Sequence, residues 1–162
     1  MDKNKYSQGL IELYQGEILG EVLFNEMLSI YEEPDQQYKI SVLLQLETET
    51  KARLRPVMMA AGLDLREQQA SRKMGMDMAA AMQGKSWQET MTMVLGAVKP
   101  VVDHYREIAA SLPEKYSELG KSMVIHEQAI VDFAELELAG KQNISIDGIT
   151  AQLHNKLTYL AK

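Results

Sequence analysis

The sequence predicts an all-α protein, and its composition carries this prediction. Met, Leu, Ala, Glu, Gln and Lys, which favour helices, are plentiful among the 162 residues, whereas the alternation of Val, Ile and Thr that is typical of strands is scarce. Hydrophobic residues make up 46% of the chain, which is enough to bury one core without disulfides. We therefore expect a single helical domain over residues 1–162.

Charge and cysteine content exclude several functions. The formal net charge of -6 argues against a nucleic-acid-binding surface, which usually carries a clustered basic face. The absence of cysteine excludes thiolate chemistry and leaves carboxylates and three histidines as ligands for hard or borderline metals. The N-terminal residues lack the apolar core of a signal peptide, and no apolar run approaches the roughly 18 residues of a membrane span. We expect a cytoplasmic protein that binds neither nucleic acid nor membranes.

Two long helices are predicted before residue 62. The first runs from the N-cap Ser7 to about residue 31, with apolar side chains repeating at helical spacing. Pro34 suits the first turn of the second helix, which continues to about residue 61. Pro56 lies inside this second helix and removes one backbone hydrogen bond, so a kink is expected there.

Residues 62–86 are too many for a hairpin turn and predict a helical crossover. The Asp64–Glu67 stretch has the form of a capping box that would begin this helix. Met74, Met78 and Met82 repeat every four residues, which is compatible with thioether copper binding or a methionine-rich partner groove. We interpret this repeat instead as the apolar face of the crossover helix.

A second pair of long helices follows the crossover. Capping boxes predict helices over 86–110, with a second kink at Pro100, and over 111–140. The short connection between them requires an antiparallel pair. Ser145 is expected to cap an extra C-terminal helix with a narrow apolar stripe that consists of Ile146, Ile149, Leu153, Leu157 and Leu160. Together with the methionines, this stripe offers enough apolar surface for a homodimer.

An acidic residue on an apolar seam is the most unusual feature of the chain. Glu47 shares a helix face with Leu43, Leu54 and other apolar residues, so it points inward. A buried ionised carboxylate costs several kcal/mol, in order of magnitude, unless a cation or donor meets it. Glu17 also lies on an apolar stripe, at about the same distance from the connecting turn as Glu47. His126 and the adjacent glutamate fall near the middle of the 111–140 helix.

With these residues, the chain over about 7–140 resembles the ferritin-like superfamily of carboxylate-bridged di-iron proteins. In that family the four helices carry one Glu, a Glu-x-x-His, another Glu and another Glu-x-x-His. The resemblance implies a ferritin-like four-helix bundle, with a long helical crossover between parallel second and third helices. The sequence departs from the pattern at Thr50, where histidine is expected, and at Ile130. The third helix has no glutamate at mid-depth. It carries Asp103, His104 and Glu107 instead, one or two turns away from the level of the other candidate ligands.

Two hypotheses for function follow. In the first, the protein is a ferritin-like metal-binding oxidoreductase that holds manganese or iron, the latter as a single ion or a di-iron pair, and performs oxygen or redox chemistry. Its candidate ligands are Glu17, Glu47, His126, Glu127 and His104. In the second, the bundle has lost its metal and serves as an interaction or structural protein. There, a buried hydrogen-bonded cluster would join Glu17, Glu47 and His126 to Thr50 and to Tyr14 or Tyr105.

Overall fold

The computed structural model describes residues 3–156, with side chains from residue 6 onward, and this part of the chain is helical without strands. The all-α prediction is confirmed. The elements in chain order are α1 (Lys3–Met27), α2 (Pro34–Ala60), α3 (Gln69–Met82), α4 (Trp87–Ser111), the 3₁₀ turn η1 (Glu114–Tyr116), α5 (Ser117–Leu138) and α6 (Asp147–Thr150). Within the described residues, no helix combines the length and the apolar character that a membrane crossing requires.

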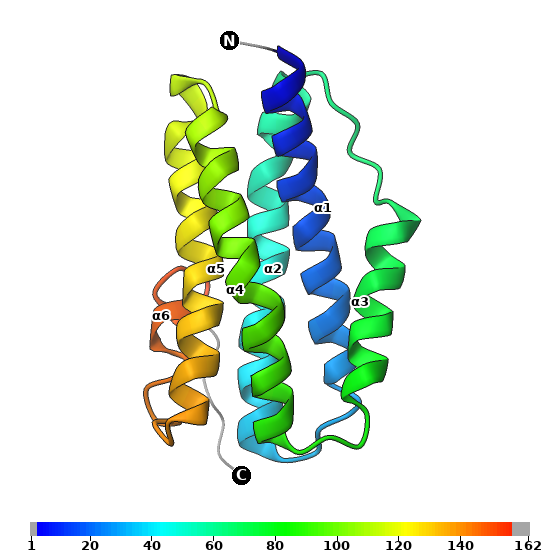
Figure 1. Ribbon diagram of the computed structural model, residues 1–162, viewed down its shortest axis with the longest axis vertical. Coiled ribbons are helices and arrows are strands. Elements are labelled where there is room, and N and C mark those ends of the chain that lie inside the picture. The colour runs from blue at the N-terminus through cyan, green and yellow to red at the C-terminus, as the bar shows by residue number, and fades with distance from the viewer. Residues whose placement is uncertain (1–2, 157–162) are drawn as a thin grey trace.

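Four long helices form the bundle, and α3 lies outside it (Figure 1). Helices α1 and α2 run antiparallel to each other, as do α4 and α5, whereas α2 and α4 point in the same direction. This arrangement is possible because the chain between α2 and α4 passes back along the bundle and forms α3, which packs on α1. The short α6 packs on α5 and also contacts α2.

Two predicted helix starts are confirmed. Pro34 occupies the first turn of α2, where the Glu33 side chain accepts a hydrogen bond of 2.8 Å from the Asp35 amide. At the start of α4 the Ser86 side chain accepts from the Glu89 amide, and the Glu89 carboxylate accepts from the Ser86 amide, which is a complete capping box. Pro56 and Pro100 lie inside continuous helices.

Two boundaries in the first half of the chain were predicted wrongly. Ser7 is not an N-cap, because α1 is already helical from Lys3. Asp64 does not begin the crossover helix, because its carboxylate accepts from the Arg66 amide and pairs with the Arg66 side chain in a local turn. Helix α3 begins only at Gln69.

The boundaries after α4 also differ from the prediction. Ser111 is the last residue of α4 and donates its hydroxyl to the Ile108 carbonyl, so α5 begins six residues later, after η1. The extra C-terminal helix is a single turn, Asp147–Thr150, and residues 151–156 are not helical. Ser145 hydrogen-bonds Glu137 instead of capping a helix. The predicted stripe residues 157 and 160 lie outside the described residues.

The methionines of α3 divide between core and surface. Met82 is buried and Met78 packs against the core, whereas Met74 and Met76 are 55% and 46% exposed. The interpretation as an apolar face therefore holds for the C-terminal half of α3, and Met74 lies at the protein surface.

The apolar core consists of two clusters, one toward each end of the bundle. One contains Leu10, Leu13, Ile18, Leu54 and Met123 among others, and the second contains Leu23, Phe24, Leu43, Ile130 and Phe133 among others. Glu47 and His126 lie between residues of the two clusters in the sequence of their own helices, and Glu17 lies next to Ile18, the last α1 residue of the first cluster.

A buried ion pair joins α2 to the C-terminal end of α5. Lys39 Nζ lies 2.8 Å from Glu137 and 2.6 Å from Asp35, and the Lys39 and Glu137 side chains are 3% and 1% exposed. Trp87 donates to the same Glu137 carboxylate at 2.7 Å, and so does Ser145. Burial lowers the pKa of Lys39, but its hydrogen bonds to Asp35 and Glu137 outweigh that effect and raise it.

We predict that Lys39→Met destabilises the protein by about 3–5 kcal/mol, because it leaves the buried Glu137 carboxylate without its cation. Lys73→Met is the matched control, since Lys73 pairs with Asp77 in a bridge whose side chains are 74% and 62% exposed. That control should cost less than about 1 kcal/mol. Urea unfolding of both variants measures the difference, and equal losses would contradict the prediction.

Candidate metal centre

Three helices bring Glu17, Glu47 and His126 together in the middle of the bundle. Nε2 of His126 on α5 lies 3.4 Å from Oε1 of Glu47 on α2 and 3.6 Å from Oε2 of Glu17 on α1. One ligand atom from each residue can be chosen so that all three atoms lie within 4.8 Å of one another. The three side chains therefore surround a common point, as the helical spacing predicts.

The cluster is buried and leaves polar atoms without partners. Glu17 and His126 have no exposed surface, and Glu47 is 3% exposed. Both carboxylate oxygens of Glu17 and the Nε2 atom of His126 are buried and have no partner at hydrogen-bond geometry among the described residues. More than nine in ten buried polar groups in proteins are hydrogen-bonded, and a buried charged group without a partner is costly. Within the cluster these atoms meet only through the charge attraction between His126 and the two carboxylates, at 3.4 Å and 3.6 Å.

Thr50 orients the imidazole of His126. Its Oγ1 lies 3.3 Å from Nδ1, which directs Nε2 toward the two carboxylates. Histidines that bind metals usually donate a hydrogen bond from the nitrogen that does not bind the metal, and this bond fixes the ring. In the tautomer that carries its proton on Nδ1, the imidazole can donate to Thr50, and Nε2 then offers the lone pair that a metal needs.

Two glycines of α1 leave room for polar groups at this level. A Cβ atom on Gly20 would lie 2.5 Å from Oε2 and 2.8 Å from Oε1 of Glu47, and one on Gly16 would lie 2.1 Å from the Tyr105 hydroxyl. Both contacts are far below van der Waals separation. Any other residue at position 20 would displace the Glu47 carboxylate from its place beside His126.

Glu127 and Tyr105 lie at the edge of the cluster. Glu127 Oε1 is 4.0 Å from His126 Nε2, and the residue is 8% exposed. Burial raises the pKa of Tyr105 well above its usual value, and the negative charges of Glu127, Glu17 and Glu47 raise it further. Tyr105 is therefore a neutral phenol that faces the carboxylates.

The burial of so many charges shifts the pKa values of the cluster. Burial raises the pKa of Glu17 well above its usual value, although the positive charge of His126 opposes this. Burial also raises the pKa of Glu127, to about 7. For His126, burial lowers the pKa, but the charges of Glu17 and Glu47 dominate and raise it to about 10. Without a metal, the cluster retains protons that exposed side chains would lose.

Other predicted site residues lie elsewhere. His104 is exposed and pairs with Glu12 at 2.9 Å, and the structure does not bring it to the cluster. Asp103 is exposed and pairs with Arg106. Tyr14 donates its hydroxyl to the Leu65 carbonyl at 3.1 Å and so does not join the cluster in the way considered for a metal-free bundle.

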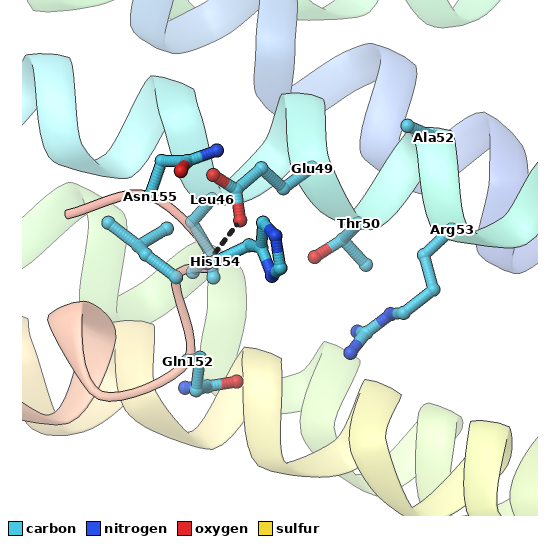
Figure 2. A pocket seen from close by; sticks show the side chains of 9 residues that line it. Leu46, Glu49, Thr50, Ala52, Arg53, Gln152, His154 and Asn155 are labelled. Atoms are coloured by element: carbon cyan, nitrogen blue, oxygen red, sulfur yellow. Dashed lines mark hydrogen bonds between the residues drawn. The ribbon is translucent and has the colours of Figure 1, made fainter.

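A cavity of about 490 Å³ lies between α2 and the C-terminal segment (Figure 2). Glu49, Thr50 and Arg53 line it from α2, and His154 lines it from the other side. Its acidic residue is already engaged, because Glu49 accepts hydrogen bonds from the His154 amide at 2.7 Å and from Gln45 at 2.6 Å. These bonds hold the C-terminal segment on α2, which gives the region a structural role.

Sequence reasoning missed a second cavity, which adjoins the cluster. It has a volume of about 230 Å³, and Glu47, Glu127 and Tyr105 are among the residues that line it. Its walls come from α1, α2, α3, α4 and α5, so no local pattern in the sequence could have revealed it. The methionine repeat of α3 was the only sequence feature that pointed to this cavity, because Met74 and Met78 line it.

Comparisons with protein-family models, with curated proteins and with solved structures found no match for this chain.

We predict that Gly20→Ala destabilises the protein by about 1–3 kcal/mol, because the new methyl group overlaps the Glu47 carboxylate and must displace it from its place beside His126. Gly96→Ala on α4 is the matched control. A Cβ there meets nothing within 4 Å, so replacing a helical glycine should stabilise the protein by about 0.5–1 kcal/mol. Denaturant unfolding of both variants checks the opposite signs.

We also predict that the metal-free protein loses stability as the pH rises through the neutral range. The pKa of Glu127 rises from 4.5 to about 7 on folding, so its contribution is fully present below pH 4.5 and is lost as the pH passes 7. The loss amounts to at most about 3 kcal/mol. The raised pKa of His126 continues the decline toward pH 10.

Glu127→Gln should remove the part of this slope between pH 4.5 and 7. Glu135→Gln on the exposed face of the same helix should leave it unchanged, because that side chain is 50% exposed. Urea unfolding in the presence of a chelator, at half-unit pH steps, measures the slope. A variant with the wild-type slope would show that Glu127 does not titrate with folding.

Proposed function

We propose that this chain is a metal-binding protein of the ferritin-like type, which holds iron or manganese between Glu17, Glu47 and His126. The observation that carries the proposal is the set of unpartnered, fully buried atoms that converge there, namely both Glu17 oxygens and His126 Nε2. A cation at their common point would supply the missing partner of each atom.

The chemistry of the donor set supports iron or manganese. Two carboxylates and one imidazole offer oxygen and nitrogen donors, which hard and borderline divalent ions prefer, and the two negative charges balance the charge of one such ion. Thr50 completes the set by orienting His126 from the outside. Glu127, 4.0 Å from Nε2, is the additional carboxylate on which a second ion would depend.

The bundle topology agrees with a ferritin-like fold. Helices α2 and α4 run in the same direction, and the intervening chain returns along the bundle (Figure 1). The candidate ligands lie in the middle of three long helices. Iron or manganese bound at this place would supply redox chemistry with oxygen, and the proposal therefore includes an oxidoreductase activity.

A metal-free bundle is the second candidate. His126 Nε2 lies 3.4 Å and 3.6 Å from two carboxylates, a separation at which a protonated imidazole would be attracted to both. The charges of Glu17 and Glu47 raise the pKa of His126 to about 10, which keeps that proton at neutral pH. In this case the cluster would be an internal ion pair in an interaction or structural protein.

The two candidates predict different effects of Glu17→Gln on how the stability of the protein responds to metal. With a metal bound, the change removes an anionic ligand, and the variant should lose the stabilisation that binding gives, roughly 2.7 kcal/mol when the free metal is about 100 times its dissociation constant. With a chelator present, the variant should be at least as stable as the wild type, because glutamine avoids the cost of ionising a carboxyl group whose pKa burial already raises.

Thermal melts with Mn²⁺, with anaerobic Fe²⁺ and with chelator, combined with equilibrium dialysis, measure both effects. Glu12→Gln is the control, because it makes the same substitution on the same helix at a pair that is 38% exposed. It should keep the metal response of the wild type. A wild-type protein that binds neither ion in dialysis and melts at one temperature in all three conditions would refute the metal proposal.

A further inference from the structure

The cavity of about 230 Å³ beside the cluster has apolar walls and one polar end. Leu19, Phe24, Val98 and Ile130 contribute apolar side chains, and α3 contributes Met78. The polar groups are the carboxylates of Glu47 and Glu127 and the phenol of Tyr105. Ligand sites in proteins commonly combine an apolar lining with a few polar groups that fix the orientation of the ligand.

The volume limits the size of the occupant. A dry protein cavity of about 150 Å³ holds a benzene molecule. In proportion, about 230 Å³ suits a molecule of roughly nine or ten non-hydrogen atoms.

The cavity has a way in from the surface. Met74 lines it while 55% of that residue is exposed, so the opening lies on the side that α3 covers. Helix α3 packs on α1 through Gly75, where a Cβ would lie 2.6 Å from the Leu19 carbonyl oxygen. On the other side of the opening, Ala97 and Val101 of α4 line the cavity and are only partly buried.

We infer that this cavity binds a small molecule with an apolar body and a terminal hydroxyl group. The apolar walls take the body, and a hydroxyl can donate a hydrogen bond to a carboxylate of Glu47 or Glu127 and accept one from Tyr105. The same carboxylates disfavour a ligand that ends in an anion, because like charges repel strongly in a buried site. A hydrocarbon without a donor would leave these polar groups unsatisfied.

The inference extends the proposed function, since Glu47 belongs both to the metal cluster and to the cavity wall. It does not depend on a bound metal, because the cavity exists without one. The two proposals can therefore fail separately, and each variant below affects only one of them.

The probe is 2-phenylethanol, which has nine non-hydrogen atoms and one hydroxyl. Protein labelled with ¹³C at the methionine methyl groups is titrated with it by NMR, once with chelator and once with Zn²⁺ as a diamagnetic ion. The Met74 and Met78 signals should shift and saturate in both titrations. Met76 lies on the same helix but does not line the cavity, so its signal should stay in place.

Three comparisons define the site. Phenylacetate should bind at least tenfold more weakly than 2-phenylethanol, and ethylbenzene should also bind more weakly. Ala97→Phe should fill the cavity, raise the dissociation constant for 2-phenylethanol at least tenfold and leave metal binding intact. Lys99→Phe places the same ring on the exposed face of α4 and should bind the probe as the wild type does. Glu17→Gln should lose metal but keep the probe, because Glu17 does not line the cavity.

Absence of saturable shifts at Met74 and Met78 in both titrations would overturn the inference, and so would wild-type binding by a folded Ala97→Phe variant. If Ala97→Phe does not fold, Val101→Phe on the same wall takes its place with the same expected loss. Phenylacetate binding as tightly as 2-phenylethanol would also overturn the inference, because the polar end would then not select for a hydroxyl. None of these results alters the dialysis measurement that decides metal binding.

Discussion

The burial of carboxylates around one imidazole is the constraint on which the middle of this bundle depends. Glu17, Glu47 and Glu127 approach His126 within 4.0 Å, at the level where the two apolar clusters meet. An unsatisfied buried charge costs several kcal/mol, whereas a whole domain is stable by only about 5–15 kcal/mol. A bundle that retains such a cluster must therefore either share protons within it or bind a cation there.

The other buried charges of the chain show how this protein satisfies groups that serve stability alone. Lys39 meets two carboxylates, and its partner Glu137 also receives hydrogen bonds from Trp87 and Ser145. Lys51 likewise meets Glu21, and it meets Glu67 at 3.0 Å, which ties the crossover segment to the bundle. In both networks, every buried carboxylate oxygen that the structure describes has a hydrogen-bond partner. The contrast with Glu17 distinguishes the cluster from an ordinary buried ion pair.

Helical periodicity predicts most of the site, because it depends on one helix at a time. Glu17, Glu47 and His126 each fall on an apolar seam, and equal distances from a connecting turn place Glu17 and Glu47 at one level. His104 was a candidate only because it stands on the helix where the ferritin-like pattern expects a further glutamate, and it does not lie on the apolar stripe of that helix. Its neighbour Tyr105 points inward, and since successive residues on a helix differ by about 100°, His104 points to solvent.

What the sequence could not predict depends on competing hydrogen bonds, some local and some between distant elements. Asp64 and Ser111 have the residue types of N-caps, but local hydrogen bonds to Arg66 and Ile108 engage them instead. Ser145 hydrogen-bonds Glu137 on α5 and so does not cap a long helix. The burial of Lys39 is also invisible in the sequence, because it requires Glu137 from the far end of the chain.

The glycines of α1 show that the cluster shapes the helix around it. Glycine inside a helix costs about 0.5–1 kcal/mol relative to alanine, so its presence needs a reason. Gly75 has a packing reason, because the group nearest to it is the backbone carbonyl of Leu19. Gly16 and Gly20 differ, because their nearest neighbours are the Tyr105 hydroxyl and the Glu47 carboxylate. Both also line the cavity of about 230 Å³. The space that these two glycines leave is therefore occupied by the polar groups of the candidate centre and by the cavity next to it, rather than by a neighbouring helix backbone.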